Sequence, residues 1–308
     1  MAKKVKAVSG DTMSRLNRIS PVSNFLFNAL FVALALMCFL PIIFIAIISL
    51  TDNNVIRTQG YQLWLTAETI SADAYAYLWT QRQTILHALW VSIYVTAIGT
   101  CIGVALTTVM GYVLSRTEHK LNNFLTILIF IPMVFGGGMA ASYVVTSQVL
   151  HLKDSIWAMI LPAIMSPWSI FLMRNFMKSV PDSLYESASI DGAGDFRIFW
   201  QIFLPLAKPA LATVGLFLVL GYWNQWYGAM LYIESPEKYP LQYFLQKIIN
   251  QANITLLIQQ GITINTQDMP SESIKMATAV VATGPIILVY PFVQKYFVSG
   301  MTVGAVKG

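Results

Sequence analysis

Long apolar stretches alternate with shorter polar segments along the chain, and their length predicts helices that cross a membrane. A spanning helix needs about 20 mostly apolar residues, and six stretches meet this requirement. They are approximately Phe25–Leu50, Thr84–Ser115, Asn123–Leu150, Ile156–Met173, Ala210–Leu231 and Met276–Val293. None of them has an Asp, Glu, Lys or Arg well inside its apolar run. The pattern therefore predicts an all-α polytopic membrane protein with six transmembrane helices.

The composition agrees with this prediction. Of the 308 residues, 56% are hydrophobic and 11% are charged, whereas soluble domains carry about 25% charged residues. Too little charge remains to cover a water-facing surface, which excludes a soluble enzyme and the disordered and fibrous classes. The first apolar stretch is too long and begins too late for the core of a signal peptide. We therefore expect it to stay in the protein as a spanning helix.

The basic residues predict how the helices are oriented. Of the 19 Lys and Arg residues, 13 lie in the two tails, the second short loop and the segment after the fourth span. Because Lys and Arg concentrate on the cytoplasmic side, we expect both termini in the cytoplasm. The expected division is a cytoplasmic tail at 1–24, a first transmembrane helix at 25–50, an extracytoplasmic loop at 51–83, a transmembrane core at 84–299 with an extracytoplasmic loop at 232–274, and a cytoplasmic tail at 300–308.

Proline and glycine interrupt several apolar stretches. The interrupting residues are Pro41, Pro132, Pro162, Pro167, Pro285 and three consecutive glycines, Gly136, Gly137 and Gly138. Two interpretations remain open: kinks that are common in any helical bundle, or a hinge at the three glycines that bends when a pathway opens. In the second stretch, Gly99 and Gly103 have the GxxxG spacing, which is typical of close helix contact.

The polar segment between the fourth and fifth stretches carries the most information. Ser183 and Glu186 have the spacing of a capping box, which predicts a short helix from about Leu184 to Ile190. Asp191-Gly192 then predicts a turn, because glycine tolerates a positive φ. A second helix is predicted to begin near Asp195.

The second helix has aromatic residues at i, i+3, i+4 and i+7, which predict one apolar face. They are Phe196, Phe199, Trp200 and Phe203. Pro205 and Pro209 are expected to end the helix and lead into the fifth span. A helix–turn–helix of this kind indicates either a surface that docks a protein or a hairpin that lies on its own membrane. The pattern alone favours neither interpretation.

The segment resembles the EAA loop of bacterial ABC importer permeases. The resemblance rests on Glu186-Ser187-Ala188, Gly192 after three residues, and Ile202-x-Leu204-Pro205 after nine more. Asp191-Gly192-Ala193 and Leu204-Pro205-Leu206 are similar to the carbohydrate-uptake branch, the second permease of maltose-type systems. The strings GYWNQWYGAMLYI and EKYPLQYFLQ resemble permeases of the lipoprotein-linked, complex-oligosaccharide subgroup. Ser187 departs from the usual Ala but is nearly as small.

This resemblance implies a type I ABC importer permease fold whose EAA loop, at 181–209, holds the coupling helices. Glu186 would face a basic residue in a groove of a separate ATPase, and Gly192 would form the bend between the helices. The residues implied in ATPase coupling are Glu186, Ser187, Ala188, Asp191, Gly192, Ala193, Phe196 and Phe199.

The resemblance also implies the partners and the location. They are a second homologous permease subunit in a heterodimer, an ATP-binding-cassette ATPase dimer and an extracytoplasmic solute-binding protein that delivers an oligosaccharide. The chain would lie in the bacterial cell (inner) membrane. We expect no nucleic acid, no metal and no cofactor in this chain, with ATP and Mg used by the partner ATPase.

Motifs that the sequence lacks narrow the alternatives. No GxxxxGK[ST] phosphate loop occurs, so an ATPase site in this chain is not expected. No charged residue lies in the middle of a span, which argues against an ion-coupled carrier. An ABC permease for a peptide or polyamine and an ATP-independent secondary carrier remain as alternatives.

Aromatic and amide residues follow one another where the fifth stretch nears its end. Aromatic faces stack on sugar rings and amides bond to hydroxyl groups, so the cluster is a candidate substrate path. The alternative is an aromatic belt at the membrane surface, although amides are costly against lipid. The candidate path residues are Tyr222, Trp223, Asn224, Trp226 and Tyr227.

Overall fold

The structure is a computed structural model that describes residues 20–116, 120–258, 272–285 and 287. Its regular elements are helices, and within these ranges the only β pairing is an isolated bridge between Thr51 and Ile70. The first half contains α2 (Pro21–Ser49), α3 (Asn53–Gln59), α4 (Asp73–Thr80), α5 (Arg82–Ser115), α6 (Asn122–Val134), α7 (Gly138–Val144) and the π-helix η1 (Val145–Val149). The second half contains α8 (Trp157–Ile160), η2 (Leu161–Ala163), α9 (Pro167–Lys178), α10 (Asp182–Ile190), α11 (Asp195–Ile198), the π-helix η3 (Phe199–Phe203), α12 (Leu204–Leu206), α13 (Lys208–Trp223), α14 (Tyr227–Tyr232), η4 (Pro236–Lys238) and α15 (Leu241–Ile258). Residues 272–285 are also helical.

Two helices, α2 and α5, are each long and apolar enough to cross a membrane alone. Three further pairs meet this requirement only when both helices are counted together, so the described residues contain two to five candidate spans. The third and fourth apolar stretches are therefore not continuous helices, and the fifth is divided between α13 and α14. The sixth, Met276–Val293, lies partly outside the described residues.

The sharpest break lies at the glycines of the third stretch. α6 ends at Val134, α7 begins at Gly138, and the two helices are bent by 119°. Gly138 has a φ of +74°, which residues with a Cβ rarely adopt. The interruption predicted from these glycines is present, and it turns α7 back from the direction of α6.

The other two bent pairs are bent less sharply. In the fourth stretch, Pro162 lies in η2 and Pro167 begins α9, and the two helical parts are bent by 47°. The helix that ends at Leu206 is bent by 77° from α13. The fifth stretch breaks after Trp223, and three residues lie between the end of α13 and the start of α14. Proline explains the first of these breaks, because it removes a backbone donor from the helix.

Helix α5 forms the centre of the fold and packs against α9 and α13. The contact is close where glycine replaces a side chain. A Cβ on Gly99 would lie 2.5 Å from the ring of Tyr222, and one on Gly103 would lie 3.1 Å from the carbonyl oxygen of Ile164. The GxxxG prediction of close helix contact is therefore confirmed.

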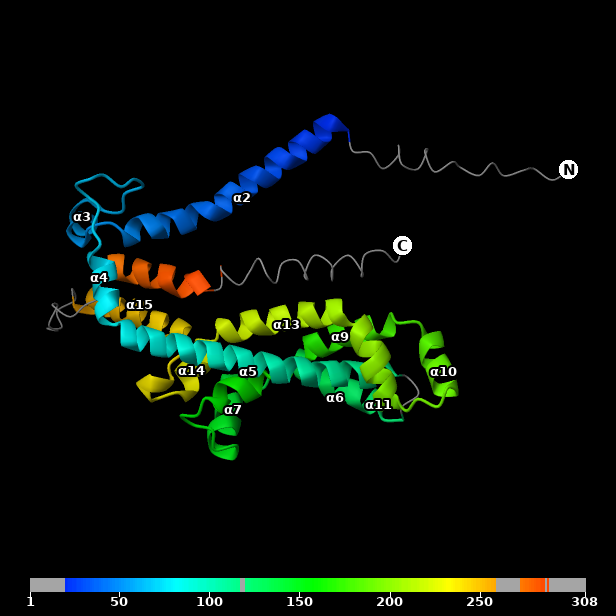
Figure 1. Cartoon of the computed structure of the whole chain (residues 1–308). Coiled ribbons are helices and arrows are strands. Elements are labelled where there is room, and N and C mark those ends of the chain that lie inside the picture. Colours follow the sequence, from blue (N-terminus) through cyan, green and yellow to red (C-terminus); the bar gives the residue numbers. More distant parts are fainter. Residues whose placement is uncertain (1–19, 117–119, 259–271, 286, 288–308) are drawn as a thin grey trace.

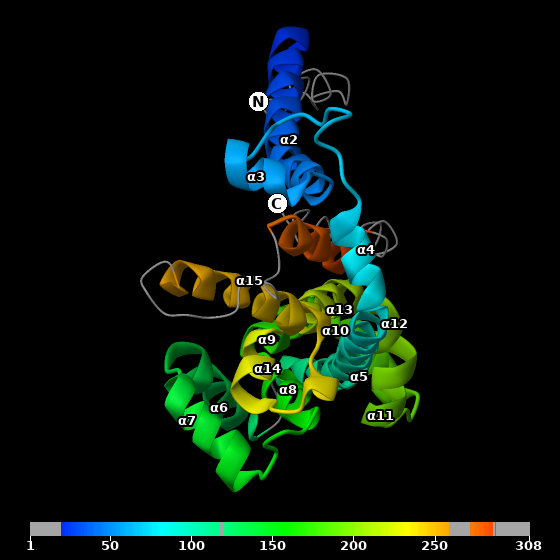
Figure 2. The same ribbon diagram turned by 90° about the vertical axis from the view of Figure 1, so that its left-hand side faces the viewer.

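Helix α2 stands apart from this centre (Figures 1 and 2). Only Ile48 and Ser49, at its C-terminal end, are buried. Its apolar side chains are exposed all around the helix, including Phe25, Phe31 and Leu40. A helix that is apolar on every face requires lipid or another protein around it.

The connecting segments gather at two opposite ends of the molecule (Figure 1). Helices α3, α4, α14 and α15 lie toward one end, which we call the α4 end. Helices α10 and α11 lie at the other, which we call the α10 end. Helix α5 runs from one end toward the other.

Candidate functional site

A hairpin of short helices, residues 182–206, projects at the α10 end of the molecule (Figure 1). Its first arm is α10 and its second arm is α11 continued through η3 and α12. Gly192 between the arms has a φ of +79°. The N–H of Ala193 donates to the oxygen of Ala188 at 2.9 Å, and that of Gly192 donates to Ser189 at 3.1 Å. These two bonds form a Schellman motif, so the turn predicted at Asp191-Gly192 is confirmed.

The predicted capping box at the start of the hairpin is wrong. Helix α10 begins at Asp182, and Pro181 occupies the N-cap without a side-chain hydrogen bond. Ser183 is therefore already inside the first turn, where its side chain cannot serve as the N-cap acceptor. The acidic residue at the first helical position instead complements the positive end of the helix dipole.

The hairpin exposes most of the residues that the sequence associated with coupling. Glu186, Ser187, Asp191 and Gly192 are exposed. Ala188 and Ala193 are half-buried, and both line a cavity of about 230 Å³ between the two arms. The small side chains therefore leave a recess between the arms.

Two large apolar side chains are unusually exposed on the hairpin. Ile190 is 86% exposed and Phe196 is 79% exposed. Contiguous apolar patches rimmed by polar residues mark surfaces that bind another molecule, and these two side chains supply apolar area beside the charged residues of the hairpin. The sequence analysis selected Phe196 but missed Ile190. An apolar residue at the end of a polar helix, as Ile190 is in α10, could have indicated a binding surface.

The predicted single aromatic face is divided between surface and core. Phe196 and Trp200 are exposed, with ring centroids 6.2 Å apart and planes inclined by 11°. Phe199 and Phe203 are buried, and each ring centroid lies 5.0 Å from that of Tyr112 on α5. Members of each pair are four residues apart, and the two pairs point in different directions. Phe199 therefore lies in the core and not on the hairpin surface.

Proline does not end the second arm as expected. The helical path continues through Pro205 to Leu206 and ends before Lys208. The N–H of Leu204 donates to the oxygen of Phe199, five residues earlier, which is a π-helical bond. This wider turn lies just before Pro205, where an ordinary helix would bring the ring against a carbonyl group.

A hydrogen bond closes the two arms. The hydroxyl of Tyr185 on α10 donates to Oδ1 of Asp195 on α11 at 2.8 Å. This bond to the Asp195 carboxylate raises the pKa of Tyr185 above its ordinary value. The arms are thus joined both at the turn and across the recess.

The second group of predicted site residues, at the end of α13, is only partly accessible. Tyr222 and Trp223 are buried, and the hydroxyl of Tyr222 donates to the oxygen of Ile160 at 3.0 Å. Asn224 is exposed, but its side-chain nitrogen donates to Leu220 within its own helix at 2.9 Å. Within this chain, the first two are therefore packing residues and not surface groups.

The exposed members of this group lie at or beside a cavity. Tyr227 and Trp226 are exposed, and Tyr227 lines a cavity of about 530 Å³ together with Ser142 and Gln225. The glycine triplet 136–138 lines the same cavity from the break between α6 and α7. The structure thus brings a predicted path residue and the predicted hinge together, although Gly138 and Tyr227 are 89 positions apart in the sequence.

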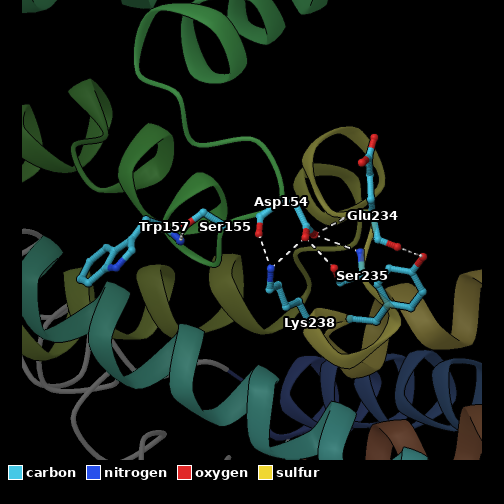
Figure 3. Close-up of polar contacts among 7 residues, drawn as sticks. Asp154, Ser155, Trp157, Glu234, Ser235 and Lys238 are labelled. Atoms are coloured by element: carbon cyan, nitrogen blue, oxygen red, sulfur yellow. Dashed lines mark hydrogen bonds and ion pairs between the residues drawn. The ribbon is translucent and has the colours of Figure 1, made fainter.

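A polar cluster ties the loop before α8 to the segment after α14 (Figure 3). Asp154 Oδ1 accepts the N–H groups of Glu234, at 3.0 Å, and of Ser235, at 2.9 Å. Lys238 Nζ donates to Asp154 Oδ2 at 2.8 Å and to the Asp154 carbonyl oxygen at 2.6 Å. We call Asp154, Glu234, Ser235 and Lys238 the Asp154 clamp. Sequence reasoning missed it, because no local pattern links residues 80 positions apart.

The surroundings of Asp154 favour its charged form. Hydrogen bonds from Lys238 and Ser235 hold the pKa of this carboxyl well below its usual range. Asp154 also has a φ of +54°, in the left-handed region. The clamp therefore fixes an otherwise unfavourable backbone conformation at the base of the α14–α15 segment.

Within the described ranges, no group of three or more His, Cys, Asp or Glu side chains is arranged to hold a metal ion. Cys38 and Cys101 are free and exposed. Both lie in apolar runs, on α2 and α5, and face outward from these helices.

The comparisons with known proteins cover most of the chain. The family model described as "Binding-protein-dependent transport system inner membrane component" matches residues 13–303. Protein LplC of Bacillus subtilis (strain 168) is 36% identical over 295 residues, which are 96% of this chain and 97% of that protein. The polygalacturonan/rhamnogalacturonan transport system permease protein YtcP of the same organism is 39% identical over 280 residues, 89% and 94% of the two chains.

A solved structure is similar over nearly the same length. It is a crystal structure of a bacterial ABC transporter involved in the import of the acidic polysaccharide alginate. The TM-score is 0.70 at 31% sequence identity, and the match covers 91% of this chain and 99% of that chain.

Proposed function

The chain belongs to the family of binding-protein-dependent transport system inner membrane components, and from this premise we propose how it works: by alternating access, driven by a separate ATPase that docks on the hairpin 182–206. It is an inner-membrane permease of a carbohydrate-uptake ABC transporter, a transport component and not an ATPase. What it moves into the cytoplasm is an oligosaccharide or a polysaccharide-derived fragment.

The observation that carries the proposal is the geometry of the hairpin. A rigid Schellman turn presents Glu186 and Ser187 on the exposed first arm and Phe196 and Trp200 on the exposed second arm. The same hairpin is anchored in the core through Phe199 and Phe203. A surface that is exposed on one side and anchored on the other is suited to transmit force from a docked subunit.

The energy requirement supports a separate ATPase. Moving a two-state gate from 1:99 to 99:1 takes roughly 5.5 kcal/mol of differential binding. In this proposal, closure of a nucleotide-bound ATPase dimer supplies that free energy through Glu186, Ser187, Ala188, Asp191, Gly192, Ala193 and Phe196. Phe199 acts from within the core by holding the second arm on α5.

We further propose a type I permease with six spans and both termini in the cytoplasm, divided as the sequence predicts. The loops expected on opposite sides of the membrane lie at opposite ends of the molecule, which supports this topology. Helices α3, α4 and α15 belong to the loops expected outside, and they gather at the α4 end (Figure 1). Helices α10 and α11 belong to the loop expected inside, and they lie at the opposite end.

The solute path is proposed to pass the cavity between the α6–α7 break and α14. Tyr227 offers an exposed ring for stacking on a sugar, and Ser142 and Gln225 offer polar groups. Bending at Gly136–Gly138 would open or close this cavity. The names of two similar proteins, the polygalacturonan/rhamnogalacturonan permease and the alginate importer, favour an acidic oligosaccharide.

Reconstitution in liposomes tests the proposal. The chain is reconstituted with its second permease, ATPase and binding protein, and uptake of acidic and neutral oligosaccharides, a peptide and a polyamine is measured. We expect ATP-dependent uptake of an oligosaccharide by the full complex and none by this chain alone. ATP-independent uptake by this chain alone would contradict the proposal, and uptake of only the peptide or polyamine would contradict its substrate class.

Charge reversal of Glu186 tests the docking surface. Glu186→Lys should weaken co-purification of the ATPase, because the side chain is exposed and would meet a basic residue. Glu237→Lys is a matched control, since it makes the same change at an exposed site at the opposite end of the molecule. Equal co-purification of both variants with the ATPase would remove Glu186 from the docking surface.

A further inference from the structure

The side chain at the end of α5 lies against the hairpin 182–206. Arg116 is the C-cap residue of α5, and its side chain is 17% exposed. The guanidinium carbon lies 3.6 Å from the centroid of the Tyr185 ring, and Nη1 lies 3.5 Å from Oδ1 of Asp182. Both partners belong to α10, the first arm of the hairpin. One guanidinium therefore joins the longest helix of the described structure to this arm.

The same guanidinium reaches the second arm. Its carbon lies 6.0 Å from the ring centroid of Phe203 in η3. Tyr185, on which it stacks, donates its hydroxyl to Asp195 at the start of α11. Arg116 thus lies near one ring of each arm, Tyr185 of the first and Phe203 of the second. Through Tyr185 it is also linked to Asp195, where the second arm begins.

Few side chains attach α10 to the rest of the molecule. Helix α10 has no buried residue, and Tyr185 and Ala188 are its two side chains that pack against the central core. The Arg116–Asp182 ion pair adds little by itself, because Asp182 is 84% exposed. The stacked pair of Arg116 and Tyr185 is therefore the main contact through which α10 meets α5.

The C-terminal end of α5 is held firmly enough to pass a displacement onward. Arg174 Nε on α9 donates to the oxygen of Leu114 at 3.0 Å. Asn122 Nδ2 on α6 donates to the oxygen of Arg116 at 2.8 Å. Helix α5 has 34 residues, which at about 1.5 Å per residue corresponds to roughly 50 Å. Helix α5 therefore offers one continuous element from Arg116 toward the α4 end (Figure 1).

We propose that Arg116 is the positioning residue that couples the hairpin to the membrane helices, with Tyr185 as its partner. The proposal rests on the function proposed above, because it assumes that an ATPase moves the hairpin. Arg116 touches neither solute nor nucleotide. It acts by making α5 follow α10, so its loss should separate ATP hydrolysis from uptake.

The experiment measures ATP hydrolysis and solute uptake together in the reconstituted full complex. We expect Arg116→Ala to lower uptake by about 2- to 30-fold, the range seen for residues that carry coupling. ATP hydrolysis and co-purification of the ATPase should remain at the wild-type level, so more ATP is hydrolysed per solute. Arg116→Lys should restore little, because an ammonium group lacks the planar stacking surface.

Two further variants make the outcome specific. Arg82→Ala is the matched control, since Arg82 lies at the opposite end of α5 and its guanidinium carbon lies 5.5 Å from the ring centroid of Trp79, away from the hairpin. Its ratio of ATP hydrolysis to uptake should not change. Tyr185→Leu, which removes the stacking partner, should reproduce the uncoupling of Arg116→Ala. If Arg116→Ala does not reach the membrane, Arg116→Lys and Tyr185→Leu are judged by the same ratio.

Two results for Arg116→Ala would overturn the proposal. An unchanged ratio of hydrolysis to uptake, or loss of uptake together with loss of ATPase binding, would show that Arg116 does not transmit movement. Failure of the proposed function itself looks different, since the wild-type complex would then show no ATP-dependent uptake at all.

Discussion

At the scale of the residue, the conformation of Gly192 carries the most specific expectation. Its φ of +79° costs an L-residue about 1–2 kcal/mol, and a β-branched residue more. A Cβ there would meet nothing within 4 Å, so the penalty is backbone strain and not a clash. We therefore expect Gly192→Val to abolish uptake while the protein remains in the membrane, as measured by transport assay and immunoblot.

A neighbouring glycine provides the matched control. Gly194 has a φ of −73° and a ψ of 161°, which valine adopts readily, and its Cβ position is equally open. Gly194→Val should keep nearly wild-type uptake. Equal effects at the two positions would show that the turn geometry is not what matters.

Asp154 gives a prediction about stability and pH. The low pKa of Asp154 in the folded protein means that the charged clamp stabilises the fold above the ordinary Asp pKa of about 3.9. This stabilisation is lost as the pH falls through the folded-state value. Asp154→Asn should therefore lower the melting temperature of the purified protein by a similar amount from pH 8 to pH 5, and by less below about pH 4.

The control for the clamp is an exposed ion pair beside it. Glu234 takes part in the clamp only through its backbone N–H, and Glu234→Gln removes the negative charge that pairs with Lys153 at 2.8 Å. Both side chains of this ion pair are largely exposed. Because exposed pairs contribute little, the melting temperature should stay unchanged. If this variant lost as much stability as Asp154→Asn, charge alone and not the clamp geometry would be responsible.

Local signals predicted some of these residues, and tertiary contacts decided the others. The Asp191-Gly192 turn was predictable because it needs only the backbone freedom of one residue. The burial of Tyr222 was not, because it depends on a hydrogen bond to Ile160, 62 positions away in the chain. The role inferred for Arg116 had no sequence signal beyond its place near the end of an apolar stretch.

At the scale of the element, spacing predicted the helices better than it predicted their breaks. Helices α2 and α5 match the first two apolar stretches closely. The glycines predicted an interruption between α6 and α7, but periodicity contains no information on its angle of 119°. The split of the aromatic face was not predictable either, since it depends on Tyr112 of another helix, which packs against Phe199 and Phe203.

The break between α6 and α7 can be tested with two adjacent glycines. Gly138 has a φ of +74°, whereas Gly137 has a φ of −67° and a ψ of −9°. Gly138→Ala should strain the break by about 1 kcal/mol and slow uptake severalfold, because it disfavours the bent form. Gly137→Ala places its Cβ at an ordinary 3.6 Å from Ala141 and should have little effect. Indistinguishable uptake rates would argue against a hinge at Gly138.

At the scale of the whole molecule, the chain is built to be one part of an assembly. Helix α2 exposes apolar side chains on every face, and the hairpin exposes Ile190 and Phe196. The sequence predicted the class of the assembly through the hairpin motif, because that motif is short and local. It did not predict which faces of this chain the partners cover, since that depends on surfaces formed by distant segments.

The most direct test of the account determines on which side of the membrane the hairpin lies and whether the bound ATPase shields it from a labelling reagent. Cys38 and Cys101 are exposed and are first replaced by Ser. Single cysteines are then placed at Ser187 on the hairpin and at Glu237 at the opposite end. With a membrane-impermeant maleimide, Glu237→Cys should react in intact cells, and Ser187→Cys only after permeabilisation and in the absence of the bound ATPase. Labelling of Ser187→Cys from outside intact cells, or equal labelling with and without the ATPase, would contradict the account.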